Sequence, residues 1–338
     1  MARGTAVTNT STSDHASSRP MLRVADISVE ISRNGTARNG TARNGTARNG
    51  TAARPVDGVS FDLAPGEILG LAGESGSGKT LTLRAIMGLL PKGANMTGAV
   101  ELAPLDPTDA PLTGALGGRG VGMIFQEPFT ALNPTMRVGN LIGEAVRSTD
   151  HVKGRAREAR VLELMGQVGM SDPRGQSRMW PHQLSGGMRQ RVMIAAALVA
   201  RPRVLLCDEP TTALDVSVQD QILGLLADIR RDTGMSIVFV THDLAVLGEL
   251  CDRINVMYAG QLVETGPVAD VFERPHHRYT EALLESVPSL SEKVDRLADV
   301  VGHPPNPSAF PPGCRFEPRC RHAQRDCVEP MTAGDRAR

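Results

Sequence analysis

An eight-residue glycine-rich segment, residues 73–80, constrains this chain more than any other feature. It reads G-E-S-G-S-G-K-T and matches the pattern G-x-x-x-x-G-K-[ST] of loops that cradle phosphate groups. The apolar run 68–72 before it is typical of a buried strand, and residues 80–90 after it predict a helix. Glycines let backbone N–H groups approach phosphate oxygens, and a helix N-terminus adds partial positive charge. The predicted nucleotide-binding residues are Gly73, Glu74, Ser75, Gly76, Ser77, Gly78, Lys79 and Thr80, with no role assigned to the next position, Leu81.

Side chains at and near this loop predict a magnesium–nucleotide site. Lys79 can reach the β- and γ-phosphates, and the hydroxyl of Thr80 can ligate Mg²⁺. The apolar run 204–207 predicts a second strand that ends in two acids, Asp208 and Glu209. One carboxylate at such a strand end can hold Mg²⁺ through water, and another can polarise an attacking water. We assign the first role to Asp208 and the second to Glu209; the alternative is that both acids only cap the following loop.

A second glycine-rich segment, Leu184-Ser-Gly-Gly-Met, begins a predicted helix over residues 185–200. Ser185 can cap this helix, while Gly186 and Gly187 leave backbone N–H groups bare at its positive end. By itself the segment is typical of an ordinary helix N-cap. In a chain that already has a phosphate loop, we interpret it as a second phosphate-binding surface.

The composition narrows the class of protein. Hydrophobic residues make up 41% of the chain and charged residues 22%, which favours a sizeable core over global disorder. Lys+Arg and Asp+Glu both count 37, so the chain lacks the basic excess of nucleic-acid binders, and we expect no nucleic-acid partner. Its longest apolar run, 192–200, is far shorter than the roughly 20 residues of a membrane span. We expect a soluble or peripheral protein of the reducing cytosol, in which the five cysteines form no disulfide framework.

The order of predicted elements indicates an α/β fold with added subdomains. Strands at 120–125, 204–207 and 236–241 alternate with helices at 185–200 and 216–231, which implies a parallel core sheet covered on both faces. Alternating runs at 22–31 and 56–63, with a strand near 98–102, predict an antiparallel β subdomain, and residues 127–183 approximately predict an inserted helical subdomain. Residues 1–20 predict a disordered leader, with Met1 and Met21 as alternative starts. The pentapeptide R-N-G-T-A, repeated four times over 33–52, predicts a flexible loop.

Six motifs in order resemble those of ABC-type ATPase subunits, over roughly residues 22–288. They are the phosphate loop, Gln126, Leu184-Ser-Gly-Gly-Met, Cys207-Asp-Glu-Pro, Ala213-Leu-Asp and His242. The resemblance implies a P-loop NTPase fold over residues 21–288, with ATP and Mg²⁺ as cofactors, and two subunits that enclose two ATP molecules between them. It implies that Glu209 is the catalytic base, that Gln126 senses Mg²⁺ and the attacking water and links to a membrane partner, and that His242 contacts the γ-phosphate as a switch. The phosphate loop of one subunit would face residues 185–187 of the other, and Asp215 would contact the opposite subunit.

A narrower resemblance points to the ATPases of oligopeptide/dipeptide importers. It rests on residues 124–134 and 208–219, on His277-Arg-Tyr-Thr-Glu-Ala-Leu-Leu, and on Gly313-Cys-Arg-Phe-Glu-Pro-Arg-Cys. It implies ATP hydrolysis that powers import of peptides, or of a related solute such as nickel, at the cytoplasmic face of the inner membrane. The implied partners are a second ATPase subunit (a copy or a paralogue), two membrane permeases and, indirectly, an extracytoplasmic solute-binding protein. The alternative is a soluble ABC ATPase acting on nucleic acid or ribosomes, which the neutral charge and the single nucleotide-binding unit disfavour.

Two departures from the family pattern stand out. Family members usually stack adenine on an aromatic residue just after the first strand, where this chain has Ile31 and no aromatic residue before Phe61. The tail, residues 289–338, carries Cys314, Cys320 and Cys327 with the spacing C-x5-C-x6-C, which is not that of short zinc motifs. The resemblance suggests a [4Fe-4S] cluster here, with a fourth ligand from His322 or a partner, and three unliganded thiols are the alternative.

Overall fold

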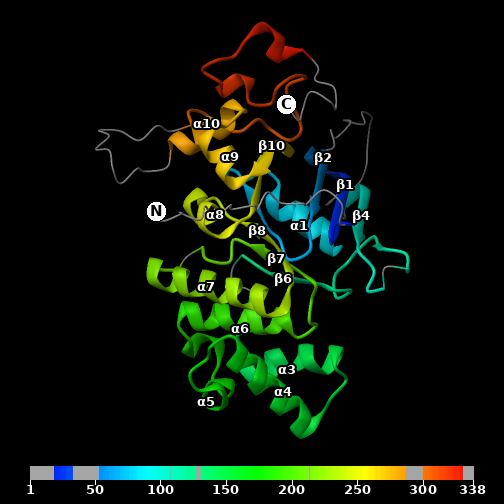
Figure 1. The fold of residues 1–338 in the computed structure, drawn as a ribbon, viewed down its shortest axis with the longest axis vertical. Coiled ribbons are helices and arrows are strands. Elements are labelled where there is room, and N and C mark those ends of the chain that lie inside the picture. Colours follow the sequence, from blue (N-terminus) through cyan, green and yellow to red (C-terminus); the bar gives the residue numbers. More distant parts are fainter. Residues whose placement is uncertain are drawn as a thin grey trace, which may run out of the picture.

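The computed structural model describes residues 19–32, 53–106, 108–126, 131–212, 214–286 and 300–329 (Figure 1). The predicted leader up to residue 18, the pentapeptide repeat, and Ala213 of the predicted Ala-Leu-Asp motif lie outside these residues. The first residues assigned to the helical subdomain, 127–130, also lie outside them.

A six-stranded sheet forms the centre of the molecule. Its strands follow the order β10-β9-β3-β8-β7-β6. Their bounds are β3 (Ile68–Ala72), β6 (Val121–Ile124), β7 (Val204–Asp208), β8 (Ser236–Val240), β9 (Arg253–Tyr258) and β10 (Gln261–Pro267). The five strands from β9 to β6 pair in parallel, and β10 runs antiparallel to β9 at the edge. The predicted parallel core sheet is therefore confirmed.

Successive side chains of the central strands face two separate hydrophobic cores. On β8, Ile237 and Phe239 belong to one core and Val238 and Val240 to the other, because alternate side chains of a strand point to opposite faces. The first core includes α6 (Gly186–Leu198) and α7 (Val216–Thr233), and the second includes α1 (Lys79–Met87). Burial on both faces explains why these strands read as continuous apolar runs.

A four-stranded antiparallel sheet packs against the second core. It has the order β2-β1-β4-β5 and consists of β1 (Leu22–Ile31), β2 (Ala53–Leu63), β4 (Ala94–Leu102) and β5 (Leu112–Thr113). β1 pairs with β2 and with β4, and every pairing in this sheet is antiparallel. The predicted antiparallel subdomain is present, and it brings β2 beside the phosphate loop.

A group of helices lies beyond α6 and α7, on the side away from the sheet (Figure 1). It comprises α3 (Val138–Thr149), α4 (Gly154–Gln167), α5 (Pro173–Ser177) and the 3-10 turn η1 (Pro181–Gln183). Val161, Leu164 and Met165 of α4 are buried in the same core as α6. The predicted helical insertion is thus anchored on the core, and its outer boundaries, 127–183, stay a prediction.

The chain ends in short helices and an irregular segment at the opposite end of the molecule from α3–α5 (Figure 1). Those helices are α9 (Val268–Glu273) and α10 (Arg278–Glu285), and the 3-10 turns are η2 (Glu317–Arg319) and η3 (Arg325–Val328). A further helix, α8 (Leu244–Leu250), lies between β8 and β9 in the sequence. We call residues 300–329 the C-terminal region. Within the described part of the chain, no helix combines the length and the apolar character that crossing a membrane requires.

Candidate nucleotide-binding and catalytic site

The phosphate loop joins β3 to α1 and opens onto a cavity of about 250 Å³. Gly78, the residue before α1, has φ 108°, which is in the region that favours glycine, and no side chain caps the helix. A side chain would also not fit at Gly73, where a Cβ atom would lie 2.1 Å from the carbonyl oxygen of Met257. Six residues of the loop and helix line the cavity, joined by three from elsewhere: Ser75, Gly76, Gly78, Lys79, Thr80 and Leu81, with Pro55, Gln126 and Glu209.

Lys79 is the buried cation of this loop, with 5% of its surface exposed. Its Nζ donates hydrogen bonds to the carbonyl oxygens of Gly73, at 2.6 Å, and Glu74, at 2.9 Å. Burial lowers the pKa of its ammonium group, and the nearby carboxylates of Glu209, Asp208 and Glu74 oppose that shift. The lysine is therefore folded back onto its own loop, with its charge beside the cavity.

Thr80 and Asp208 place two oxygen atoms, both potential metal ligands, close together beside the cavity. The Thr80 hydroxyl donates to Oδ1 of Asp208 at 2.9 Å. Asp208 is 1% exposed, and burial raises its pKa although the Thr80 hydrogen bond acts in the opposite direction. Mg²⁺ is held in such sites by one or two carboxylates together with substrate phosphates, so this donor set fits Mg²⁺.

Glu209 gathers the other predicted catalytic residues around a single oxygen atom. Its Oε2 accepts hydrogen bonds from Nε2 of Gln126 at 3.1 Å and from the hydroxyl of Thr212 at 3.0 Å. Nδ1 of His242 lies 3.4 Å from the same oxygen. The backbone of Glu209 has φ 45°, a strained conformation for a residue with a side chain, which is common at functional sites. Thr212 was not among the predicted site residues, although its position three residues after Glu209 was an available signal.

The Leu184-Ser-Gly-Gly-Met segment lies in a different place. Ser185 caps α6 by accepting the N–H of Met188 at 3.3 Å. A Cβ atom at Gly187 would meet Cγ1 of Val218 at 2.5 Å, so the segment packs directly against the start of α7. That helix is capped by Asp215, whose pKa is lowered by the hydroxyl of Ser217 and by the N–H of Val218.

Ser185 and Asp215 are exposed, and neither they nor Gly186 and Gly187 are among the residues that line the phosphate-loop cavity. The predicted site residues therefore fall into two surfaces of one chain. The first holds the phosphate loop, Asp208, Gln126, Glu209 and His242. The second holds residues 185–187 and Asp215.

Neither Glu74 nor Ile31, which stands where an adenine-stacking aromatic residue was expected, lines the cavity. The carboxylate of Glu74 is paired with Arg319 of the C-terminal region, with Nη1 2.8 Å from Oε2. Ile31 ends β1 opposite Ala53 and Ala94, and Pro55 is the β2 residue that lines the cavity.

The three cysteines of the C-terminal region do not form a metal site in this structure. Their described neighbours include His277, whose Nε2 lies 3.9 Å from Sγ of Cys314. No three His, Cys, Asp or Glu side chains among the described residues are placed to hold one metal ion. The arrangement of Cys314, Cys320 and Cys327 therefore does not fit the suggested [4Fe-4S] cluster, and His322 does not complete one.

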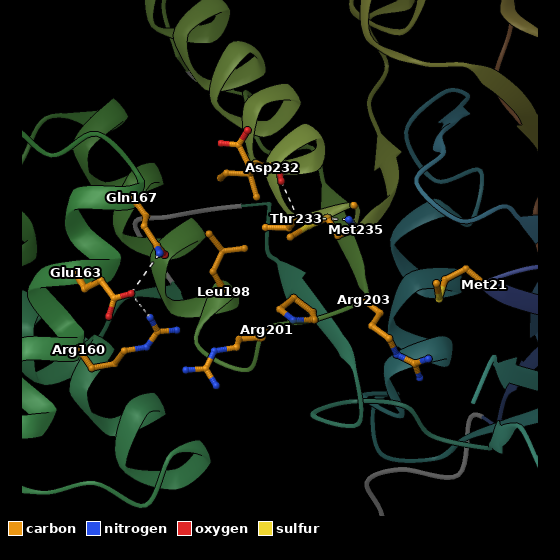
Figure 2. A pocket seen from close by; sticks show the side chains of 13 residues that line it. Met21, Arg160, Glu163, Gln167, Leu198, Arg201, Arg203, Asp232, Thr233 and Met235 are labelled. Carbon is orange, nitrogen blue, oxygen red and sulfur yellow. Dashed lines mark hydrogen bonds and ion pairs between the residues drawn. The ribbon is translucent and has the colours of Figure 1, made fainter. Parts of the chain in front are cut away.

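A second cavity, of about 660 Å³, lies between α4 and the segment that joins α6 to β7. Figure 2 shows Arg160, Glu163 and Gln167 on the α4 side of this cavity and Arg201 and Arg203 across from them. Although it is wider than the phosphate-loop cavity, no residue of the phosphate loop or of the Glu209 group lines it. We therefore take the smaller cavity as the candidate nucleotide site.

Comparisons with known proteins identify the family to which this chain is similar. A family model for ABC transporters matches residues 56–212, and one for the oligopeptide/dipeptide transporter C-terminal region matches residues 263–327. A putative peptide import ATP-binding protein of Brucella abortus is 41% identical over 315 residues, which cover 92% of this chain and 90% of that protein. The dipeptide transport ATP-binding protein DppD of Escherichia coli is 44% identical over 277 residues, covering 81% of this chain and 85% of that protein.

Solved structures support the fold. A subunit of an ABC transporter complex from Clostridium perfringens has a TM-score of 0.56 at 24% identity, covering 75% of this chain and 91% of that one. A dimeric ATP-binding cassette bound to ADP and Pi has a TM-score of 0.57 at 24% identity, covering 73% of this chain and 99% of that one. The chain belongs to the ABC transporter ATP-binding proteins, in the group that carries the oligopeptide/dipeptide transporter C-terminal region.

Proposed function

We propose that this chain binds and hydrolyses MgATP and thereby powers the import of peptides through a membrane ABC transporter. The observation that carries the proposal is the convergence of Gln126, Thr212 and His242 on Oε2 of Glu209, at the edge of the phosphate-loop cavity. A carboxylate held in this way can accept a proton from an attacking water. Peptide cargo is proposed from the relatives that are named as peptide or dipeptide transport proteins.

Each residue of the candidate site has a separate role in phosphoryl transfer. Backbone N–H groups of the phosphate loop and the N-terminus of α1 bind phosphate oxygens, and Lys79 turns from its loop carbonyls to the β- and γ-phosphates. Thr80 and Asp208 would hold Mg²⁺, which neutralises charge on the phosphate oxygens. Glu209 takes a proton as the water oxygen bonds to the γ-phosphorus and the bond to the β–γ bridging oxygen breaks. Gln126 and His242 orient the water and the γ-phosphate.

One chain supplies only part of each site. Ser185 and Asp215 are exposed and do not line the cavity, so we propose that a second ATPase subunit presents its own copy of this surface to the phosphate loop. That subunit is a copy of this chain or a paralogue. Two membrane permeases at the inner membrane would receive the conformational change of the two ATPase subunits. The ATPase would lie at the cytoplasmic face and a solute-binding protein on the other side.

Two variants test the proposed chemistry. Glu209→Gln keeps the shape of the side chain and removes its basicity, so we expect ATP hydrolysis to fall about 10²- to 10⁴-fold with ATP affinity retained. Lys79→Ala removes the buried cation and should lose ATP affinity in a calorimetric titration. Arg231→Ala, in an exposed ion pair with Asp228 on α7, is a matched control. Near-wild-type ATP turnover by Glu209→Gln in the same preparation contradicts the assignment of Glu209 as the catalytic base.

A third variant tests the composite site. Ser185→Arg leaves the cavity of the chain untouched, so ATP binding to the isolated chain should stay within about twofold of wild type while hydrolysis falls on the order of 10²-fold. Because the change also removes a helix cap, Asp172→Ala, which removes the cap of α5, is the control. Wild-type hydrolysis by Ser185→Arg means that the second surface takes no part in the reaction.

A mild-detergent pull-down of the tagged chain, read by mass spectrometry, tests the transport role. We expect two multi-span permeases and an ATPase partner. Recovery of ribosomal or DNA-associated proteins without any membrane protein favours the alternative, an ABC ATPase that acts on nucleic acid or ribosomes, and leaves the ATPase chemistry in place.

A further inference from the structure

The second residue of the phosphate loop, Glu74, is held by groups from the end of the chain. Nη1 of Arg319 lies 2.8 Å from Oε2 of Glu74, and Nη2 lies 3.1 Å from Oε1. This is a bidentate guanidinium–carboxylate pair, the geometry that fixes both partners most strictly. The two residues are 245 positions apart in the sequence.

Arg319 is built into this contact rather than resting on a surface. Its side chain is 5% exposed. Besides the two bonds to Glu74, Nη1 donates to the hydroxyl of Tyr258 at 3.3 Å, Nη2 to the carbonyl of Val300 at 2.8 Å, and Nε to that of Val301 at 3.0 Å. An arginine has five N–H donors, and all five have acceptors here, so no other side chain can reproduce the contact.

A tyrosine fixes the backbone of Glu74 as well. The N–H of Glu74 donates to the hydroxyl of Tyr279 at 2.8 Å. Tyr279 is fully buried, and burial raises the pKa of its hydroxyl, which therefore stays neutral. Its ring lies 4.5 Å from that of Tyr258 and 5.4 Å from that of Phe316, between centroids. The chain has two tyrosines in 338 residues, and both are in this cluster with a phenylalanine of the C-terminal region.

Glu74 also contacts Lys79, the cation that we propose binds the phosphates. Arg319 holds the side chain of Glu74 and Tyr279 holds its N–H, while its carbonyl oxygen accepts a hydrogen bond from Nζ of Lys79 at 2.9 Å. Its N–H, its side chain and its carbonyl thus each have a defined partner. A shift of Glu74 would move the loop carbonyl that positions Lys79.

We propose that Arg319 and Tyr279 are positioning residues of the nucleotide site. Together they form a clamp on Glu74 that keeps the phosphate loop in the conformation that binds ATP, so the C-terminal region controls ATP affinity. The inference rests on the proposed function of the phosphate loop. It assigns to the C-terminal region a role inside the same subunit, on the face of the loop away from the cavity.

The test uses the full chain and measures the Kd of Mg-ATPγS by calorimetry, and the KM and kcat for ATP. Arg319→Ala and Tyr279→Phe should each raise Kd and KM, by roughly 5- to 150-fold for the arginine, the usual range for coupling between sites, and by less for the tyrosine. The kcat at saturating ATP should change less than KM. Arg319→Lys keeps the charge without the bidentate geometry, and we expect an intermediate Kd.

The control is Arg321→Ala, which breaks an exposed ion pair with Glu285 two positions away from Arg319. We expect it to leave Kd and KM at wild-type values. In a double-mutant cycle, Glu74→Ala combined with Arg319→Ala should bind no more weakly than Arg319→Ala alone, because both changes break the same contact.

A purely structural role predicts a different pattern. Arg319→Ala and Tyr279→Phe would then lower the midpoint of urea unfolding while the folded protein kept wild-type Kd and KM, and that result overturns the proposal. Tyr279→Phe removes one oxygen atom, so it reports on the clamp even if Arg319→Ala does not fold. Lys79→Ala separates the two hypotheses. If it retains wild-type affinity, the nucleotide site itself is misplaced; if it loses affinity while both clamp variants keep theirs, only the clamp fails.

Discussion

Two glycines of the phosphate loop differ in the space around them, and this difference predicts a measurable gap in stability. Gly78 has φ 108°, and a Cβ atom there would lie 2.7 Å from Cε of Met257 and 2.8 Å from the carbonyl oxygen of Pro55. Gly76 has φ 81°, and a Cβ atom there would meet nothing within 4 Å. We therefore compare Gly78→Ala with Gly76→Ala.

Both variants place alanine at positive φ, which costs about 1–2 kcal/mol. Only Gly78→Ala adds a clash, and because one clashing atom belongs to the backbone of β2, a side-chain rotation cannot relieve it. Overpacking of this kind typically costs about 1–3 kcal/mol. The expected loss of unfolding free energy is about 1–2 kcal/mol for Gly76→Ala and about 2–5 kcal/mol for Gly78→Ala.

Urea unfolding of the nucleotide-free protein, followed by circular dichroism, measures the two losses. The absence of nucleotide matters because ligand binding would add its own stabilisation. Alanine lowers the entropy of the unfolded chain equally at both positions, so the difference between the variants isolates the clash. Equal destabilisation of the two variants refutes the reasoning, since it would mean that β2 yields without cost.

Three further outcomes are expected. Leu226→Ala, at a fully buried position of α7, should cost about 2–5 kcal/mol of unfolding free energy in urea, and Leu225→Ala, half-buried on the same helix, should cost clearly less. Burial lowers the pKa of His277, although a nearby glutamate opposes this shift. The neutral form therefore stabilises the fold above the unfolded pKa of about 6.5, and that stabilisation is lost as the pH falls below this value. Between about pH 7.5 and pH 5.5, the urea midpoint of His277→Gln should drop less than that of wild type. Iodoacetamide should label Cys327, which is half-exposed, and spare Cys207, which is fully buried with its thiol pKa raised by that burial; peptide mass spectrometry that finds equal labelling contradicts the described burial.

Elements that depend on local sequence were predictable. The strand 68–72, the phosphate loop and the helix after it form one continuous stretch whose pattern carries all the necessary information. The strand 204–207 is read equally well because both of its faces are buried. By contrast, β9 and β10 were not predicted. β9 carries Arg253 and Asn255 within its apolar run. Asn255 is buried, and its side-chain oxygen accepts a hydrogen bond from the hydroxyl of Thr265 of β10.

Contacts between distant segments were beyond the reach of the sequence. The family resemblance of the tail suggested that Cys314, Cys320 and Cys327 hold a metal cluster, but a shared motif does not determine where irregular backbone places side chains. Glu74 was assigned to the nucleotide because it lies in the loop motif. A motif fixes backbone geometry at such a position and leaves the direction of the side chain to its surroundings, here Arg319.

The two surfaces of the site imply two separate routes by which ATP hydrolysis is controlled. Ser185 and Asp215 are exposed and do not line the cavity of their own chain, so we expect their influence to depend on a second subunit. Arg319 and Tyr279 are buried and act on the phosphate loop of their own chain through Glu74. The contribution of an interface residue is lost when the subunits separate, whereas the contacts of Arg319 and Tyr279 with Glu74 are present in the isolated chain. We therefore expect different groups to set the ATP affinity of one subunit and hydrolysis by the pair, so that each can change without the other.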